Sequence, residues 1–221
     1  MIKINLETIN LLFDSAIEMG CRAYKNENLC NHISFKVGGP CPLLIEPKDE
    51  KQLTEILKSI KETETPYIIL GNGTNVLVLD EGLNKVVVKI GDEMTRLSLE
   101  DEDVICCSAG TKVVTLCKFA LENSLSGLEF AYGIPGTCGG AVFMNAGAYG
   151  GEMKDVVEAV SFMDTTGQQY VVSGEEMEFG YRKSALSDTD CIITAATIKL
   201  DYGDRATIID KMNEQGTEVL L

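Results

Sequence analysis

The sequence predicts an α+β protein in which the pattern of predicted strands and helices changes near residues 91–96. Before this boundary, a strand–helix–strand order predicts a small βαβ-like unit with a parallel pair of strands. After it, strand-like runs flank residues 133–151, which hold seven of the 21 glycines and no charged side chain. Such a density of glycine needs a reason, such as positive φ angles or the close approach of a ligand. The apolar residues among these glycines favour a large bound cofactor over a solvated loop.

The first half of the chain contains two helical patterns and several short strands. Apolar residues recur at helical spacing in residues 9–20, which end at Gly20, and in residues 48–63, which end before Pro66. In the second of these helices, the apolar side chains share one face. Strand-like apolar runs supply the remaining elements, over residues 33–37, 43–47, 67–70, 76–79 and 85–90.

The second half is richer in strands. A strand over residues 103–110 precedes a helix over residues 111–123, for which Thr111 is a candidate N-cap. Residues 156–173 contain two β-rich runs around a Thr-Gly turn, and residues 191–200 form a further strand. The tail from residue 201 begins like a helix and then stops.

Composition excludes several function classes. The chain has 221 residues, of which 45% are hydrophobic and 24% are charged, and its net charge is −15. This charge argues against a nucleic-acid partner, because phosphate contacts need clustered lysine and arginine. No apolar run reaches membrane-spanning length, and the acidic residues near the N-terminus do not fit a secretory signal. Eight cysteines without metal-type spacing indicate a reduced, cytoplasmic protein with no metal site.

The sequence GNGTN, residues 71–75, allows two interpretations. Taken by itself, it is better explained as an Asn-Gly hairpin turn between apolar strands. It is not a Rossmann fingerprint, because Val76 occupies the third glycine position, and it is not a P-loop, because no Gly-Lys-Ser/Thr follows. The second glycine-rich segment favours instead a ligand shared by both, with Thr74 and Asn75 as side-chain donors to a pyrophosphate.

Arg182 and His32 are the other candidates for chemistry. Arg182 is the first cation after Lys154, and its guanidinium is suited to stabilise a carboxylate, a phosphate or developing negative charge. From composition alone, a surface arginine on a turn is the safer interpretation. His32 is the only histidine, and we expect it to be solvated rather than a catalytic base or a flavin anchor. A single histidine in this setting supports no Ser-His-Asp or Cys-His machinery.

Four segments together resemble the UDP-N-acetylenolpyruvoylglucosamine reductase family of flavoenzymes, which act in bacterial peptidoglycan synthesis. In chain order they are NHISFKVGGP, LGNGTNVLV, SLSGLEFAYGIPGTCGGAVFMNAGAYGGE and FGYRKS. The resemblance runs from about residue 31 to residue 200. It implies a two-lobed FAD-binding fold of the vanillyl-alcohol oxidase and CO-dehydrogenase flavoprotein type, with FAD between the lobes. It also implies that NADPH reduces FAD and leaves, after which UDP-N-acetylglucosamine enolpyruvate, a nucleotide-sugar, accepts hydride and becomes UDP-N-acetylmuramate.

The resemblance assigns roles to individual residues. Arg182 matches the family's active-site arginine, whose charge suits stabilisation of the enolate, and Tyr181 would lie near the nucleotide-sugar and NADPH site. Backbone N–H groups in two glycine segments would hold the FAD pyrophosphate, and a third segment would line the rest of the flavin. The implied cofactor-binding residues are Gly71, Asn72, Gly73, Thr74, Asn75, Gly133, Ile134, Pro135, Gly136, Thr137, Gly139, Gly140, Asn145, Ala146 and Gly147.

The resemblance also divides the chain and limits the expected activity. It implies an N-terminal helical segment, a βαβ-like FAD-binding lobe, a second FAD-binding lobe with an antiparallel sheet, and a divergent tail, over residues 1–30, 31–93, 94–201 and 202–221. The family's further domain closes over the substrate and supplies a serine proton donor and a glutamate, whereas residues 201–221 contain no serine. We therefore expect the chain to lack this domain, to carry out the second half-reaction poorly, and to self-associate through the face that the domain would cover.

Two other functions stay open at this point. One is a non-catalytic module that binds a flavin or a nucleotide-sugar, and the other is a different FAD-dependent oxidoreductase of the same fold. Tyr132 and Cys138 also depart from the family pattern, and the bulk of Cys138 beside the flavin would be able to weaken its binding.

Overall fold

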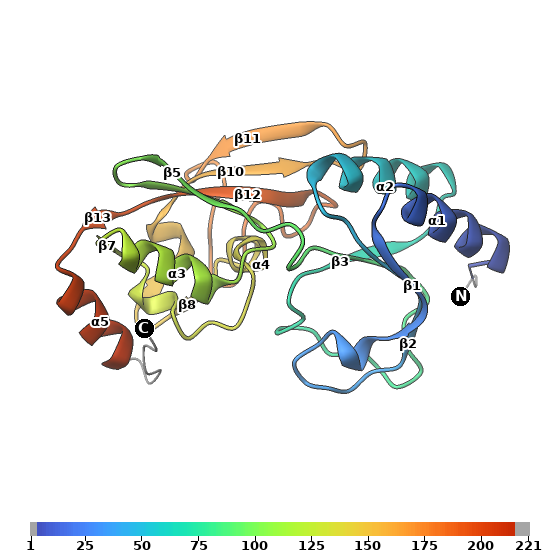
Figure 1. The fold of residues 1–221 in the computed structure, drawn as a ribbon, viewed down its shortest axis with the longest axis horizontal. Coiled ribbons are helices and arrows are strands. Elements are labelled where there is room, and N and C mark those ends of the chain that lie inside the picture. Colours follow the sequence, from blue (N-terminus) through green and yellow to red (C-terminus); the bar gives the residue numbers. More distant parts are fainter. Residues whose placement is uncertain (1–3, 215–221) are drawn as a thin grey trace. The chain divides into compact units, whose positions relative to one another are not determined.

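The computed structural model describes residues 4–214, and contacts divide the chain into two compact units (Figure 1). Unit 1 comprises residues 1–94 together with 163–168, and unit 2 comprises residues 95–162 together with 169–221. The finer division into four segments stays a prediction.

Unit 1 contains a four-stranded mixed sheet. Its elements are α1 (Leu6–Glu18), β1 (Arg22–Asn28), the 3-10 helix η1 (Leu29–Asn31), β2 (Pro40–Glu46), α2 (Glu50–Glu62), β3 (Tyr67–Leu70) and β4 (Val86–Lys89). The strand order is β1-β2-β4-β3, with β1 antiparallel to β2 and with β2 and β3 both parallel to β4. This order confirms the predicted βαβ-like arrangement with parallel strands.

The two helices of unit 1 form where the apolar periodicity predicts them. Asn5 caps α1 by accepting from the Thr8 backbone N–H at 2.7 Å, and Asp49 caps α2 by accepting from the Gln52 N–H at 2.8 Å. The helices contact each other, and α1 also packs on β1 and β2 (Figure 1). The apolar face of α2 is fully buried, as predicted, whereas Ile17 on α1 is 46% exposed.

Two predicted strands of unit 1 do not form, and one unpredicted strand does. Residues 33–37 and 76–79 are irregular, although Gly39 N–H donates to the Leu79 carbonyl at 2.9 Å. The strand β1 instead lies at the edge of the sheet and has the mostly polar sequence RAYKNEN. An edge strand with few buried positions needs no apolar run, so apolar periodicity could not find it.

Unit 2 contains a five-stranded sheet with short helices around it. Its elements are β5 (Leu97–Asp101), β6 (Val104–Ser108), α3 (Val113–Glu122), β7 (Leu125–Ser126), η2 (Glu129–Ala131), α4 (Cys138–Phe143), β8 (Gly147–Ala148), β9 (Gly151–Glu152), η3 (Met153–Asp155), β10 (Val157–Met163), β11 (Gln169–Ser173), β12 (Ile192–Lys199), β13 (Asp201–Tyr202) and α5 (Arg205–Glu214). The main sheet has the order β11-β10-β12-β6-β5, and β12 and β5 are antiparallel to β6. The predicted strands of this half are all present.

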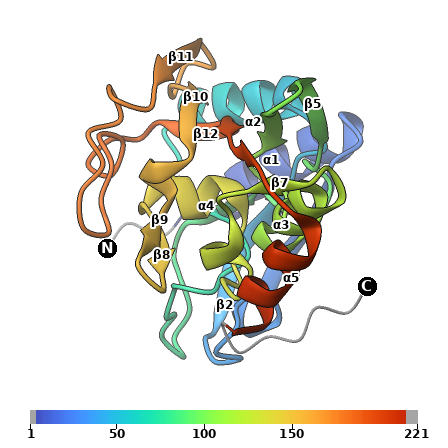
Figure 2. The same ribbon diagram turned by 90° about the vertical axis from the view of Figure 1, so that its left-hand side faces the viewer.

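The helices of unit 2 place the glycine-rich segment against the sheet. The short helix α4, which lies inside this segment, packs on β12 and β6. The helix α5, at the start of the tail, packs beside α3 (Figure 2). The N-cap of α3 is Lys112, without a side-chain cap, and not Thr111, which is buried and donates its hydroxyl to the Arg96 carbonyl. The predicted end of the tail helix lies outside the described residues.

Candidate functional site

The loop of residues 71–75 connects two parallel strands, so it is not a hairpin turn. It leaves β3 at the carboxyl edge of the parallel strands, where Glu46 and Lys89 end β2 and β4. Gly73 is buried with φ +63, and a Cβ there would lie 2.4 Å from the His32 carbonyl oxygen. Within residues 4–214, the backbone N–H groups of Gly71, Gly73 and Thr74 make no hydrogen bond. The loop therefore offers several free donors to an anion.

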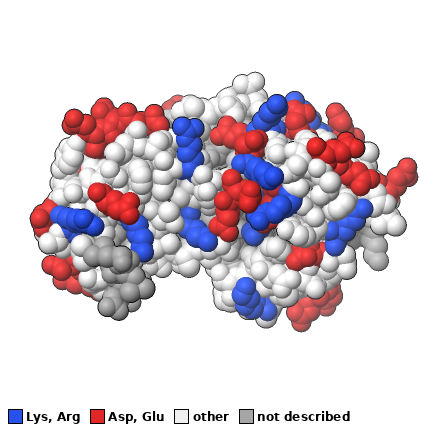
Figure 3. Space-filling model, viewed as in Figure 1, with Lys and Arg blue, Asp and Glu red and all other residues white. Residues whose placement is uncertain are grey.

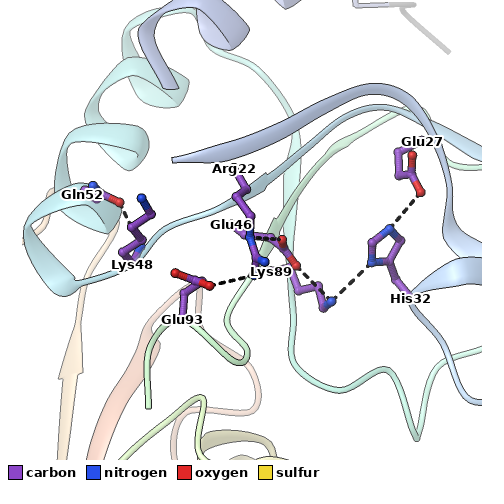
Figure 4. A network of polar contacts seen from close by, with 8 residues as sticks. All are labelled: Arg22, Glu27, His32, Glu46, Lys48, Gln52, Lys89 and Glu93. Carbon is purple, nitrogen blue, oxygen red and sulfur yellow. Dashed lines mark hydrogen bonds and ion pairs between the residues drawn. The ribbon is translucent and has the colours of Figure 1, made fainter. Parts of the chain in front are cut away.

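A charge network lies at the same edge of the unit 1 sheet (Figure 4). Glu46, only 8% exposed, pairs with Arg22 at 3.0 Å and with Lys89 at 3.0 Å. Lys89 Nζ also lies 3.3 Å from His32 Nδ1, and His32 Nε2 lies 3.0 Å from Glu27 Oε1. Because Lys89 donates to Nδ1, the arrangement fits a neutral His32 that donates its Nε2 proton to Glu27.

This network shows that the expected solvation of His32 is wrong, and it shows which charges at this edge are already paired. The prediction of a solvated His32 is wrong, since its side chain is only 14% exposed and bonded on both sides. A hydrogen bond from Asn31, and then one from His32, lower the pKa of Glu27 below its usual value. Arg22 and Lys89 are both paired with carboxylates, so we expect an anion bound at residues 71–75 to depend mainly on backbone N–H groups.

In unit 2, the segment of residues 133–140 has both used and unused backbone donors. The N–H groups of Ile134, Cys138 and Gly139 donate to the carbonyls of Ala131, Thr111 and Ala109 at 2.7–2.9 Å. Gly140 N–H donates to the Thr137 hydroxyl at 3.4 Å, which caps α4. In the described part of the chain, the N–H groups of Gly133, Gly136 and Thr137 have no acceptor. These three amides are the ones available to a pyrophosphate, and the cofactor-binding role of the whole segment stays a prediction.

Packing within the protein requires a glycine at position 139, whether or not a ligand is bound. A Cβ at this position would lie 2.6 Å from the Ala109 Cβ, so only glycine lets the start of α4 lie on the loop that follows β6. Cys138 beside it is fully buried, and a hydrogen bond with Cys107, together with burial, raises the pKa of its thiol. All eight cysteines are free thiols, and five of them are buried.

A pocket of about 290 Å³ in unit 2 brings together two motifs that lie about 30 residues apart in the sequence. One is the β8–β9 hairpin, and the other is the turn that carries Tyr181 and Arg182. The residues lining the pocket are Asn145, Gly147, Ala148, Tyr149, Gly150, Gly151, Glu152, Tyr181 and Arg182. Four of these are predicted site residues, and Ala146, a fifth, is buried beside them.

Three residues that line this pocket have unusual backbone conformations. Asn145, Tyr149 and Arg182 have φ values of +45, +51 and +52, in the left-handed region that non-glycine residues rarely adopt. Such conformations persist where the surroundings hold them, and they are frequent at functional sites. Tyr181, at the tip of its turn, is 91% exposed.

Sequence reasoning missed two residues: Glu152, which lines this pocket, and Ser184, which follows the turn that carries Arg182. Glu152 accepts from Asn145 Nδ2 at 2.8 Å, and hydrogen bonds from Lys154 and then Asn145 lower its pKa. Ser184 is fully buried and donates its hydroxyl to the Phe143 carbonyl at 2.6 Å. Glu152 and Ser184 are the last residues of two sequence segments quoted above, which end in GGE and GYRKS. Their place in these segments was the signal by which they could have been found.

Comparison with known proteins gives the family. Residues 41–173 match the FAD binding domain family. The chain is 42% identical to the UDP-N-acetylenolpyruvoylglucosamine reductase of Clostridioides difficile over 97% of its length, and 42% identical to that of Caldanaerobacter subterraneus over 87%. The chain belongs to the UDP-N-acetylenolpyruvoylglucosamine reductase family. It spans 68% and 63% of these two relatives, respectively.

Solved structures agree with this family and with the expected fold. The UDP-N-acetylenolpyruvylglucosamine reductase of Thermus caldophilus matches 88% of the chain with a TM-score of 0.74 and 36% identity, and 67% of that protein is covered. Physcomitrella patens BBE-like 1 matches 86% of the chain with a TM-score of 0.65, but at 13% identity it shows the fold alone. The α+β, FAD-binding fold is thus confirmed.

Residues 4–214 contain no helix long and apolar enough to cross a membrane. They also contain no group of three or more histidine, cysteine, aspartate or glutamate side chains arranged to hold a metal ion.

Proposed function

We propose that this chain binds FAD, takes reducing equivalents from NADPH, and reduces the enolpyruvyl group of UDP-N-acetylglucosamine enolpyruvate to give UDP-N-acetylmuramate. The observation that carries this proposal is the pocket in which the β8–β9 hairpin meets the turn bearing Arg182. Family membership at 42% identity supports the same reaction.

We infer that backbone groups, not cations, hold the anionic part of FAD. The free N–H groups of Gly71, Gly73 and Thr74 in unit 1, and of Gly133, Gly136 and Thr137 in unit 2, are suited to pyrophosphate oxygens. On the face shown in Figure 3, lysine and arginine side chains are interspersed with acidic ones, and the net charge is −15. Neutral donors at glycine-rich loops therefore explain how such an acidic chain accepts an anionic cofactor.

Arg182 supplies the fixed positive charge at the pocket. Bound FAD would provide the hydride chemistry. A guanidinium lining the pocket is suited to stabilise negative charge that develops on the substrate. We infer that Tyr181, which is largely exposed beside it, contacts the nucleotide-sugar or NADPH.

The chain's wider role is part of the same proposal. The reaction would serve peptidoglycan synthesis in the cytoplasm, and through it cell-wall biogenesis, cell shape, the cell cycle and cell division. Self-association through an exposed face also remains a proposal.

The test separates the two halves of the reaction. FAD-loaded protein is mixed anaerobically with NADPH, which should bleach the flavin absorbance, and then with the enolpyruvyl substrate, which should restore it. The rate at which the colour returns measures how well the chain completes the second half-reaction. Flavin that binds but is not bleached would contradict the proposal and favour a non-catalytic binding module.

Replacing Arg182 tests its role directly. Arg182→Ala should slow the restoration of colour by about 100-fold or more, because a charge aimed at the developing anion is lost. FAD affinity should not change. Lys183→Ala is the matched control, since it removes the neighbouring cation, which pairs with Asp188 at 2.7 Å. Equal losses in both variants would contradict a specific role for Arg182.

A further inference from the structure

We propose that Asn145 and Ser184 are positioning residues that clamp both ends of the turn carrying Arg182. This inference rests on the proposed function for its catalytic meaning. Gly180 and Lys183 form the base of the turn through two backbone hydrogen bonds, from Gly180 N–H to Lys183 O at 2.9 Å and from Lys183 N–H to Gly180 O at 3.2 Å. Tyr181 and Arg182 are the two residues at its tip.

Asn145 anchors the first end of the turn. Its buried side chain donates through Nδ2 to the Gly180 carbonyl at 3.0 Å and to Glu152 Oε2 at 2.8 Å. Its Oδ1 accepts from the Lys154 backbone N–H at 2.9 Å. Both amide protons and the amide oxygen are thus used inside the protein, so the side chain serves the turn and the β8–β9 hairpin and not the flavin.

Ser184 anchors the second end. This residue is fully buried, and its hydroxyl donates to the carbonyl of Phe143, the last residue of α4, at 2.6 Å. Its backbone N–H donates to the Ser187 hydroxyl at 2.9 Å. Both ends of the turn are therefore tied to the same three-residue stretch, residues 143–145.

The clamp explains how the turn keeps a strained arginine beside the pocket. Arg182 has φ +52, a conformation that needs support from its surroundings. Asn145 has φ +45, which asparagine tolerates better than most residues. The side chain of Asn145 reaches the turn at the Gly180 carbonyl, and Ser184 follows directly after its other end, so we expect the loss of either anchor to affect the reaction by displacing Arg182.

Hydrogen exchange tests the clamp without flavin or substrate. In the wild-type protein, the Lys183 amide should exchange at least about 100-fold more slowly than in an unfolded peptide. Asn145→Asp removes both donors and places a second carboxylate against Glu152, and Ser184→Ala removes the hydroxyl. Each should speed exchange of the Gly180 and Lys183 amides about tenfold or more. The matched control is Asn123→Asp, because Asn123 Nδ2 donates to the Phe119 carbonyl at 2.7 Å in the same unit, away from the turn.

Three results decide the proposal by exchange alone. Faster exchange in Asn145→Asp and Ser184→Ala, but not in Asn123→Asp, supports it. Unprotected Lys183 in the wild type would overturn it even if a variant fails to fold. Turn amides that exchange at the wild-type rate in folded Asn145→Asp or Ser184→Ala would overturn it as well.

A double-mutant cycle tests the catalytic part. In FAD-loaded protein, Asn145→Asp should lower kcat for the enolpyruvyl substrate about tenfold, with FAD affinity within about threefold of the wild type. In an Arg182→Ala background, Asn145→Asp should cause no further loss. Additive losses would show a merely structural role and overturn the inference. Failure of the wild-type protein to turn over would contradict the proposed function, while the exchange data would still decide the clamp.

Discussion

At the scale of single residues, buried thiols contribute to how stability depends on alkaline pH. Cys41, on β2, is 1% exposed and packs in a cluster with Leu29, Leu44 and Val87. Burial raises the pKa of its thiol from 9.0 to about 11. Burial also raises the pKa of Cys117 in unit 2. These thiols stay protonated in the folded protein at a pH where the unfolded chain already loses their protons.

The sign of the pH effect follows from this difference. Below pH 9, both states keep the Cys41 proton, so its burial does not affect the pH dependence. As the pH rises from 9 towards 11, the unfolded chain ionises first and the free energy of unfolding falls, by about 2 kcal/mol at pH 11 for this group. Urea titrations of the wild type and Cys41→Ala from pH 7 to 11 check this.

The expected result is a flatter alkaline limb in Cys41→Ala, whatever its stability at pH 7. Cys191→Ala, at a partly exposed cysteine, should keep the wild-type slope. Parallel curves for the wild type and Cys41→Ala would contradict the assignment.

Residue-scale features were also the hardest to predict from the sequence. The motif GYRKS indicated Arg182, but its left-handed φ depends on contacts with residues 143–145 that no local pattern encodes. The polar residues around His32 suggested solvation, whereas partners from β1 and β4 enclose its ring. Side-chain roles that depend on distant partners cannot be predicted from local composition.

At the scale of elements, α4 contains two adjacent glycines that are present for different structural reasons. Gly139 faces Ala109 with no room for a Cβ, whereas a Cβ at Gly140 would meet only the Thr137 hydroxyl, at 3.4 Å. Gly140 is exposed and Gly139 is buried. The glycine count of the segment therefore reflects helix packing as well as ligand approach.

This difference predicts opposite effects of one substitution at the two positions. Gly139→Ala should lower the free energy of unfolding by about 1–3 kcal/mol, because the new methyl group overpacks the contact with Ala109. Gly140→Ala, the matched control in the same helix, should leave stability unchanged or raise it by about 0.5–1 kcal/mol. Urea unfolding measures both, and a loss at Gly140→Ala as large as that at Gly139→Ala would contradict this account of α4.

Elements with strong periodicity were predictable, and elements defined by their neighbours were not. The apolar face of α2 and the strands β3, β4, β6, β10 and β12 follow from apolar pattern alone. Residues 76–79 have a strand-like sequence, but Leu77 and Leu79 are 70% exposed and pair with no strand. A strand-like sequence is therefore not sufficient, because a strand forms only where its backbone pairs with a neighbouring strand.

At the scale of the whole molecule, family membership and the distribution of backbone donors support the same cofactor. Glycine-rich segments in both units contain N–H groups without acceptors among residues 4–214. The sequence indicated these segments by glycine density, but only the structure separates the unused amides from those that close the fold. The pocket at Arg182 was also beyond local prediction, because it joins motifs from distant parts of the chain.

The central claim, that this chain binds FAD through its glycine-rich segments, is tested most directly by titrating the 221-residue protein with FAD. Quenching of flavin fluorescence reports binding. We predict saturation at one FAD per chain with a dissociation constant of about 1 µM or tighter. No saturable binding by a folded protein at about 100 µM FAD would contradict the claim.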